Sequence, residues 1–183
     1  MTNIDFYIAQ NYVETEQAEN FIRIDKEDKA IDILSQAINK ANEISDLDIS
    51  DKGFTLSIIA DRYADLGEYD IALEIIDTIE STHMSPGLSK ASSLTYIAEK
   101  YADEGRTIDS SRMLSYALDV LDSIKSGSVY RKDSALESIA YAYAKINEYD
   151  KARKVAALMQ NISFHLIFDL DIPGDEITVV HRA

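Results

Sequence analysis

The three histidines are the first residues to examine for chemistry, because imidazole is a common general base and metal ligand near neutral pH. His83, His165 and His181 are isolated, and none has a second histidine or a glutamate at the spacing of a zinc-binding helix. The sequence has no cysteine, no G-x-S-x-G motif and no phosphate-binding glycine loop. We therefore expect no catalytic residue, no metal and no cofactor, and a protein that is not an enzyme.

Two acidic clusters invite comparison with calcium sites, since carboxylates are the ligands that calcium prefers. An EF-hand loop requires glycine at its sixth position and glutamate at its twelfth, where the first cluster has Asp51 and Ser57. The second cluster is interrupted by Ile172 and Pro173. We expect helix-capping carboxylates at the first and solvated turn charges at the second. The clusters are Asp46, Asp48, Ser50 and Asp51, and Asp169, Asp171, Asp175 and Glu176.

The elements that would have to position any site are repeated along the chain. Three segments align without gaps over about 28 residues, with offsets of 38 and then 42. Each has leucine, an Ile-Ala pair and tyrosine at i, i+3, i+4 and i+7, followed four residues later by glycine or asparagine. The segments contain Leu56, Ile59, Ala60, Tyr63 and Gly67; Leu94, Ile97, Ala98, Tyr101 and Gly105; and Leu136, Ile139, Ala140, Tyr143 and Asn147.

This spacing places the apolar residues on one face of a helix. Glycine and asparagine tolerate the left-handed conformation that ends a helix, and a second amphipathic stretch follows almost at once, so each segment predicts an antiparallel helical hairpin. Small residues at Ala72, Ser110 and Ala152 suit close helix contacts. We expect loops at 85–87 and 126–128. The expected helices are 3–20, 27–44, 52–66, 69–80, 88–104, 107–125, 130–146 and 149–161.

The order Leu, Ile-Ala, Tyr, Gly, Tyr, Ala over residues 52–160 resembles the tetratricopeptide repeat (TPR) family, in a variant with a longer period than the usual 34 residues. The resemblance implies an all-α fold, a right-handed superhelix of about four helix pairs. A degenerate first unit would match Ile8, Ala9 and Tyr12 to the first helix, with about nine residues inserted near 14–26. We expect Tyr12 in the core with Tyr63, Tyr101 and Tyr143.

The resemblance further implies that first-helix positions line a concave, partner-binding face. TPR proteins that hold carboxylate termini use lysine, arginine and asparagine there, whereas this chain has several acids, which disfavours that ligand. The alternative is that these acids are merely solvated. By register the candidate positions are Phe54, Ser57, Asp61, Asp65, Thr95, Glu99, Asp103, Glu137, Tyr141 and Lys145, with Ser92 and Ser134, and Asn3, Phe6, Gln10, Val13 and Glu14 in the first unit.

The net charge of −15 repels phosphate backbones and anionic membranes, so we expect neither nucleic acid nor membrane as a partner. We expect a scaffold-like module that binds a basic or amphipathic polypeptide on its acidic concave face. The lack of cysteine fits the reducing cytoplasm, and residues 1–5 contain no basic segment followed by an apolar run that would indicate a signal peptide.

The segment after the repeats has a different pattern. Residues 1–162 are predicted to form the repeat domain and residues 163–183 an extended tail. Apolar residues alternate with polar ones, except at Ile167, and Pro173-Gly174 follows as a turn signal. Such a segment needs a surface, which could belong to the same chain or to a second copy. The alternatives to peptide binding are therefore self-assembly through this tail, or an accessory subunit of an enzyme. The alternating residues are Phe164, Leu166, Phe168, Leu170 and Ile172.

Overall fold

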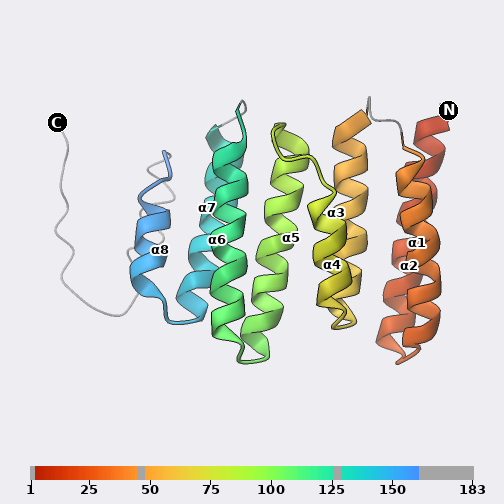
Figure 1. The fold of residues 1–183 in the computed structure, drawn as a ribbon, viewed down its shortest axis with the longest axis horizontal. Helices are drawn as coiled ribbons and strands as arrows, with labels where there is room; N and C mark the ends of the chain where they lie inside the picture. Colours follow the sequence, from red (N-terminus) through yellow and green to blue (C-terminus); the bar gives the residue numbers. More distant parts are fainter. Residues whose placement is uncertain (1–2, 45–47, 126–128, 161–183) are drawn as a thin grey trace.

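A computed structural model describes residues 3–44, 48–125 and 129–160 of the chain (Figure 1). All regular structure in these ranges is helical, which confirms the all-α expectation. The predicted tail, and the loop expected at 126–128, lie outside the described residues. The helices are α1 (Asn3–Arg23), α2 (Glu27–Asn42), α3 (Ile49–Asp65), α4 (Tyr69–Asp77), α5 (Met84–Asp103), α6 (Thr107–Ser123), α7 (Val129–Lys145) and α8 (Tyr149–Ala156).

One type of turn closes four helical hairpins. Each odd-numbered helix is followed by a residue with positive φ, at Asp25 (53°), Gly67 (77°), Gly105 (74°) and Asn147 (63°). The next backbone N–H donates to the carbonyl five residues back, which satisfies an orphan carbonyl of the helix end. The four distances are 2.9 Å for Lys26 to Phe21, 2.9 Å for Glu68 to Tyr63, 2.8 Å for Arg106 to Tyr101 and 3.0 Å for Glu148 to Tyr143.

The first hairpin corrects the predicted register. Because Asp25 occupies the turn position of Gly67, Ala18 is the counterpart of Ala60 and Phe21 that of Tyr63. Ala18 is fully buried, whereas Ala9 is exposed and Tyr12 is 59% exposed. The match of Ile8, Ala9 and Tyr12 to the first-helix signature was therefore wrong, as was a core position for Tyr12.

No insertion is needed once this register is used. The distance from Ala18 to Ala30 is twelve residues, the same as from Ala60 to Ala72. The additional residues lengthen α1 at its N-terminal side instead of forming a loop. The sequence pattern missed this because phenylalanine replaces the tyrosine of the other hairpins, and aspartate replaces their glycine or asparagine.

The helices form two layers (Figure 1). The odd helices contact one another in series, α1 with α3, α3 with α5 and α5 with α7. Each even helix packs against its own hairpin partner, and α2, α4 and α6 also contact the next odd helix. Tyr63, Tyr101 and Tyr143 are buried as expected, and the Tyr143 hydroxyl lies 3.0 Å from Ser115 Oγ on α6. The core therefore runs continuously between the layers.

The predicted loop at 85–87 is wrong, because α5 begins at Met84. Pro86 lies in the first helical turn, where backbone N–H groups form no hydrogen bond within the helix, so the N–H that proline lacks is not needed there. A Cβ on Gly53 would lie 2.7 Å from Pro86 Cβ, so α3 and the start of α5 approach too closely for a side chain.

The capping expected at the first acidic cluster is not seen at Asp48, which makes no side-chain capping bond to α3; Asp46 lies outside the described residues.

Replacement of Gly67 or Gly105 by alanine should lower the free energy of unfolding by about 1 kcal/mol each, because a Cβ disfavours the left-handed conformation. A Cβ at either position would meet open space, so the substitution tests only the cost of holding a residue with a side chain in the left-handed conformation. Urea denaturation measures the effect. Asn147→Gly is the matched control and should change stability by less than about 0.5 kcal/mol. Equal losses in all three variants would contradict the turn assignment.

Candidate binding surface on the odd helices

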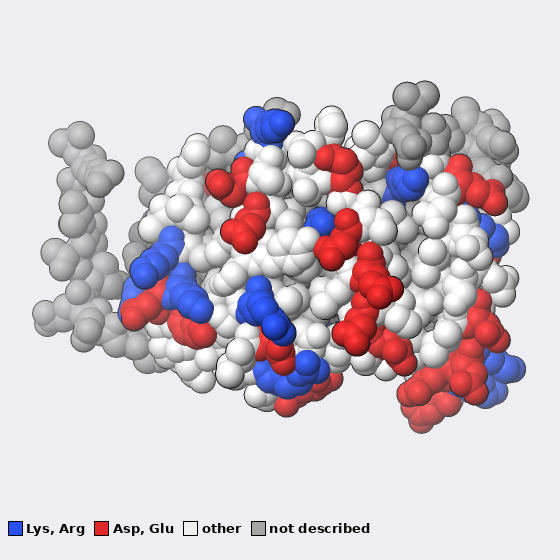
Figure 2. All heavy atoms as spheres, in the orientation of Figure 1, with Lys and Arg blue, Asp and Glu red and all other residues white. Residues whose placement is uncertain are grey.

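Residues at i, i+4, i+7 and i+11 of each odd helix lie on one stripe, opposite the buried leucine and tyrosine. The four stripes together form what we call the odd-helix face. It lies on the side away from the even helices, whose surface carries mixed positive and negative groups (Figure 2). The odd-helix face consists of Tyr12, Glu16, Glu19 and Arg23; Phe54, Ile58, Asp61 and Asp65; Ser92, Tyr96, Glu99 and Asp103; and Ser134, Ser138, Tyr141 and Lys145.

The N-terminal half of these stripes is apolar or hydroxyl-bearing. Tyr12 and Phe54 occupy the same position in successive hairpins and are 59% and 54% exposed. The corresponding residues of α5 and α7 are Ser92 and Ser134, which are also exposed. Exposed aromatic groups at one end of the face therefore give way to small side chains at the other.

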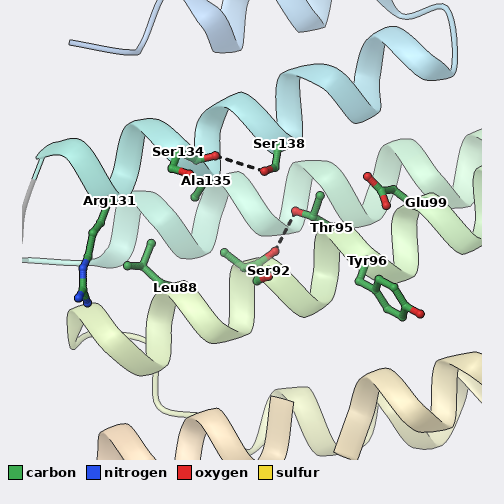
Figure 3. Close-up of a pocket in the computed structure, with 10 residues that line it drawn as sticks. Leu88, Ser92, Thr95, Tyr96, Glu99, Arg131, Ser134, Ala135 and Ser138 are labelled. Carbon is green, nitrogen blue, oxygen red and sulfur yellow. Dashed lines mark hydrogen bonds between the residues drawn. The ribbon is translucent and has the colours of Figure 1, made fainter. Parts of the chain in front are cut away.

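Between α5 and α7 the small side chains leave a hollow of about 480 Å³ (Figure 3). Arg131 and Leu88 lie at one end of it, and Tyr96 and Glu99 lie at the other (Figure 3). The hollow is therefore apolar and hydroxyl-lined in the middle and oppositely charged at its ends. Its remaining lining residues are Ala91, Ser92, Thr95, Ser134, Ala135 and Ser138.

Two hydroxyl groups of the hollow already form hydrogen bonds within their own helices. Thr95 Oγ1 donates to the Ala91 carbonyl at 2.9 Å, and Ser138 Oγ donates to the Ser134 carbonyl at 3.2 Å. Each oxygen keeps acceptor capacity after donating its proton. The floor of the hollow can therefore accept hydrogen bonds from a polypeptide backbone or side chain.

The C-terminal half of the face is charged, and one acid–base pair joins each neighbouring pair of odd helices. Arg62 of α3 lies 2.7 Å from a Glu19 oxygen of α1, and Lys100 of α5 lies 2.6 Å from Asp65 of α3. Lys145 of α7 lies 2.7 Å from Asp103 of α5. Two acids expected to contact a partner, Asp65 and Asp103, therefore pair with a neighbouring helix.

Asp65 is the most heavily bonded of these acids. Besides Lys100, it contacts Arg62 at 3.0 Å and accepts a hydrogen bond from the Tyr96 hydroxyl at 2.5 Å. Burial would by itself raise the pKa of Asp65, but the hydrogen bonds from Lys100 and Tyr96 outweigh burial and lower it. Asp65 is therefore ionised at neutral pH and has little capacity left for a ligand.

Asp61 behaves in the opposite way. Burial raises its pKa to about 6, and the Ser93 hydroxyl and the Arg62 guanidinium oppose this only in part. Its Oδ1 atom is buried and accepts no hydrogen bond from the described residues. The carboxylate is therefore kept in an environment that favours its neutral form.

Seven of the predicted site residues lie on the odd-helix face. They are Phe54, Asp61, Asp65, Glu99, Asp103, Tyr141 and Lys145. Ser57 and Thr95 are only 6% exposed and lie in the seam between helices. Thr95 and Glu99 also line the hollow. Glu137 of α7 is partly exposed and lies outside both the stripes and the hollow.

Sequence reasoning missed the face positions Ile58, Tyr96 and Ser138, and it missed Leu88 and Arg131, which lie together at one end of the hollow. The i, i+4 spacing from Phe54, Ser92 and Ser134 could have identified the first three. In α1 the corrected register moves the candidates nine residues along the chain. Asn3, Phe6, Gln10, Val13 and Glu14 are replaced by Tyr12, Thr15, Glu19, Ile22 and Arg23.

Comparison with models of protein families gives no match for this chain, and comparisons with curated proteins and with solved structures give none either. Within the described ranges, no three acidic or histidine side chains are grouped so that they could hold a metal ion. No helix in those ranges is long and apolar enough to cross a membrane.

Replacement of Asp61 by asparagine should stabilise the protein at pH 7. A folded-state pKa of about 6, above the usual 3.8 of an aspartate, means that folding takes up a proton between these values, so stability falls as pH rises through this range. The variant lacks this loss of stability. Its free energy of unfolding should exceed that of the wild type by about 1–3 kcal/mol at pH 7 and should equal it near pH 3. The difference in unfolding free energy is measured by urea denaturation across this pH range.

Asp65→Asn is the matched control, and its effect has the opposite sign. The pKa of Asp65 is lowered, so its carboxylate adds stability above the unfolded-state pKa that is lost on acidification. The variant should be less stable than the wild type at pH 7. A pH-independent difference for Asp61→Asn would contradict the buried, perturbed carboxyl.

Proposed function

We propose that this protein is a TPR-like helical repeat protein whose function is to bind another polypeptide. Four hairpins closed by the same turn and joined in series through their odd helices support a right-handed superhelix of this kind. The odd-helix face is its binding surface, and the binding is non-enzymatic. A repeat architecture alone defines a mode of action, so the ligand must be argued from the surface.

The hollow between α5 and α7 carries the proposal for the ligand. About 480 Å³ is large enough for one or two side chains of a peptide, and its middle is lined by apolar and hydroxyl groups. A second hollow of only about 30 Å³ lies beside Tyr12, Phe54 and Ile58 on the same half of the face, and it is too small for a whole side chain. A polypeptide segment that crosses the odd helices would place apolar side chains in the larger hollow and against the exposed rings of Tyr12 and Phe54.

Charge selects the orientation of this segment. Asp65 and Asp103 are already paired with lysines of neighbouring helices, so a broadly basic ligand would have to break those pairs. Glu99 and Arg131 remain as the charged ends of the hollow. We therefore propose an amphipathic segment with an apolar centre, a basic group toward Glu99 and an acidic group toward Arg131.

Filling the hollow should weaken peptide binding without unfolding the protein. Peptides are first selected against the chain from a displayed library of random peptides, and the dissociation constant of a selected peptide is measured by fluorescence anisotropy. Ser92→Phe combined with Ser134→Phe introduces the aromatic size that Tyr12 and Phe54 have at the same positions. We expect binding at least about tenfold weaker, or about 1.4 kcal/mol.

Asn39→Phe is the control, because Asn39 is exposed on α2 and does not line the hollow. Its affinity for the peptide should equal that of the wild type. Unchanged affinity in the double variant would place the ligand elsewhere, and failure to select any peptide would count against peptide binding itself.

A charge exchange tests the proposed orientation. Glu99→Lys with Arg131→Glu reverses the two ends of the hollow and keeps the net charge of the protein. A peptide selected on the wild type should bind the exchanged protein at least about tenfold more weakly. Affinity should return when the basic and acidic residues of the peptide are also exchanged. Loss of binding without this recovery would refute the assigned polarity.

The alternatives remain predictions. Self-assembly through the tail concerns residues outside the described ranges. No feature of the described residues favours an accessory subunit of a particular enzyme.

A further inference from the structure

One hydroxyl group in the seam between α3 and α5 has two acceptors and a single proton. Ser93 of α5 is 1% exposed, and its Oγ donates to the Ser57 carbonyl of α3 at 3.3 Å. The same hydroxyl also hydrogen-bonds the carboxylate of Asp61, which lies one helical turn further along α3. A serine hydroxyl carries only one hydrogen, so it cannot donate to both acceptors at once. The protonation state of Asp61 therefore decides how this seam is bonded.

A neutral Asp61 satisfies all of these groups. Its carboxyl O–H donates to Ser93 Oγ, and Ser93 donates to the Ser57 carbonyl, so a continuous chain of hydrogen bonds crosses the seam. An ionised Asp61 can only accept, so it competes with the Ser57 carbonyl for the one proton of Ser93. Its Oδ1 atom is also buried without a hydrogen-bond partner among the described residues. The closed seam thus suits the neutral acid and leaves the ionised carboxylate short of hydrogen bonds.

The charged groups around Asp61 do not supply the missing bonds. Arg62 and Lys100 lower the pKa of Asp61, and Asp65 raises it. Lys100 lies 2.6 Å from Asp65, so its charge is already paired. Arg62 is likewise paired with Glu19 of α1 at 2.7 Å. α2 and α4 contact α3 from the even layer, on the side away from the odd-helix face. The other titratable groups of the face on α1 and α5 are Glu16, Arg23, Tyr96, Glu99 and Asp103.

The neighbouring seam between α5 and α7 lacks this arrangement. The counterpart of Ser93 in α7 is Ala135, which has no hydroxyl group. The counterpart of Asp61 in α5 is Glu99, which lines the hollow. Thr95 holds in this seam the position that Ser57 holds between α3 and α5, and both are 6% exposed. The α5–α7 seam is therefore an internal control for the α3–α5 seam.

We propose that Asp61 is a proton switch for the seam between α3 and α5. The seam is closed when Asp61 is neutral. When Asp61 loses its proton the seam opens locally, and water supplies the hydrogen bonds that the carboxylate lacks. α3 carries Phe54 and α5 carries one wall of the hollow, so opening moves these two parts of the odd-helix face relative to each other. The switch would thereby regulate peptide binding by pH, and this consequence alone rests on the proposed function.

The expected size of the effect follows from proton linkage. The pKa of Asp61 is about 6 in the closed seam, whereas the ordinary value of 3.8 applies once water reaches the carboxylate. The open seam therefore binds the proton less tightly, so opening becomes more favourable as pH rises from the lower value through the higher one. Between pH 5 and pH 8 the equilibrium constant for opening should rise about tenfold.

Cysteine labelling in the full chain measures this opening, because the natural chain has no cysteine. Ser57→Cys places a thiol in the α3–α5 seam, and Thr95→Cys places one in the α5–α7 seam as the matched control. Rates of reaction with a thiol reagent at pH 5 and pH 8 are divided by those of Asn39→Cys, which is exposed on α2, to remove the change in thiolate fraction. We expect the normalised rate of Ser57→Cys to rise about tenfold.

Two comparisons decide the outcome. The normalised rates of Thr95→Cys, and of Ser57→Cys combined with Asp61→Asn, should change by less than about twofold. Equal rises at Ser57→Cys and Thr95→Cys would indicate unfolding of the whole protein and would overturn a switch confined to one seam. A rise that persists with Asp61→Asn, or no rise at all, would overturn it as well. If circular dichroism shows that Ser57→Cys is unfolded, Ala64→Cys, buried on the same side of α3, replaces it.

Regulation of binding is tested separately, since the labelling experiment needs no peptide. A selected peptide that contacts both Phe54 and the hollow should bind the wild type more weakly at pH 8 than at pH 5. Asp61→Asn should remove this difference. The same pH dependence in both proteins would overturn the regulation of binding, whereas failure to select any peptide would count against the proposed function and not against the switch.

Discussion

The left-handed residue that ends each odd helix is the constraint on which the rest of this structure depends. It reverses the chain within three residues, so the next helix must lie antiparallel against the one just finished. The same turn at four positions brings the same helix faces into the same layers. Burial of leucine, isoleucine and tyrosine between the layers then follows from the 3.6-residue period.

Small residues at the seams decide how closely the hairpins approach. Gly53 and Gly87 stand where a Cβ would collide with neighbouring atoms at 2.7 Å, and fully buried alanines hold the other contacts. Where the surface residues of α5 and α7 are also small, at Ser92 and Ser134, space remains between the helices as the hollow. The packing requirement and the proposed binding site thus arise from the same choice of small side chains.

Some of the acidic residues form ion pairs that join neighbouring odd helices. Arg62, Lys100 and Lys145 each pair with an acid of the preceding odd helix, so the cations neutralise acids at helix C-terminal ends, where the helix dipole is unfavourable to them. Partly exposed pairs of this kind contribute little energy individually. Their consequence is for recognition, because a partner that bound these acids would have to compete with the paired cations, whereas Glu99 lines the hollow.

The sequence by itself determined the helices and three of the four hairpins, because these follow from local periodicity and from residues that tolerate positive φ. It misassigned the first hairpin, where Phe21 and Asp25 serve in place of tyrosine and glycine. Only the tertiary structure decided which of the predicted binding residues are accessible to a partner. Ser57 and Thr95 are buried, Asp65 and Asp103 are paired and Asp61 is desolvated, because each depends on a neighbour 30 or more residues away in the chain.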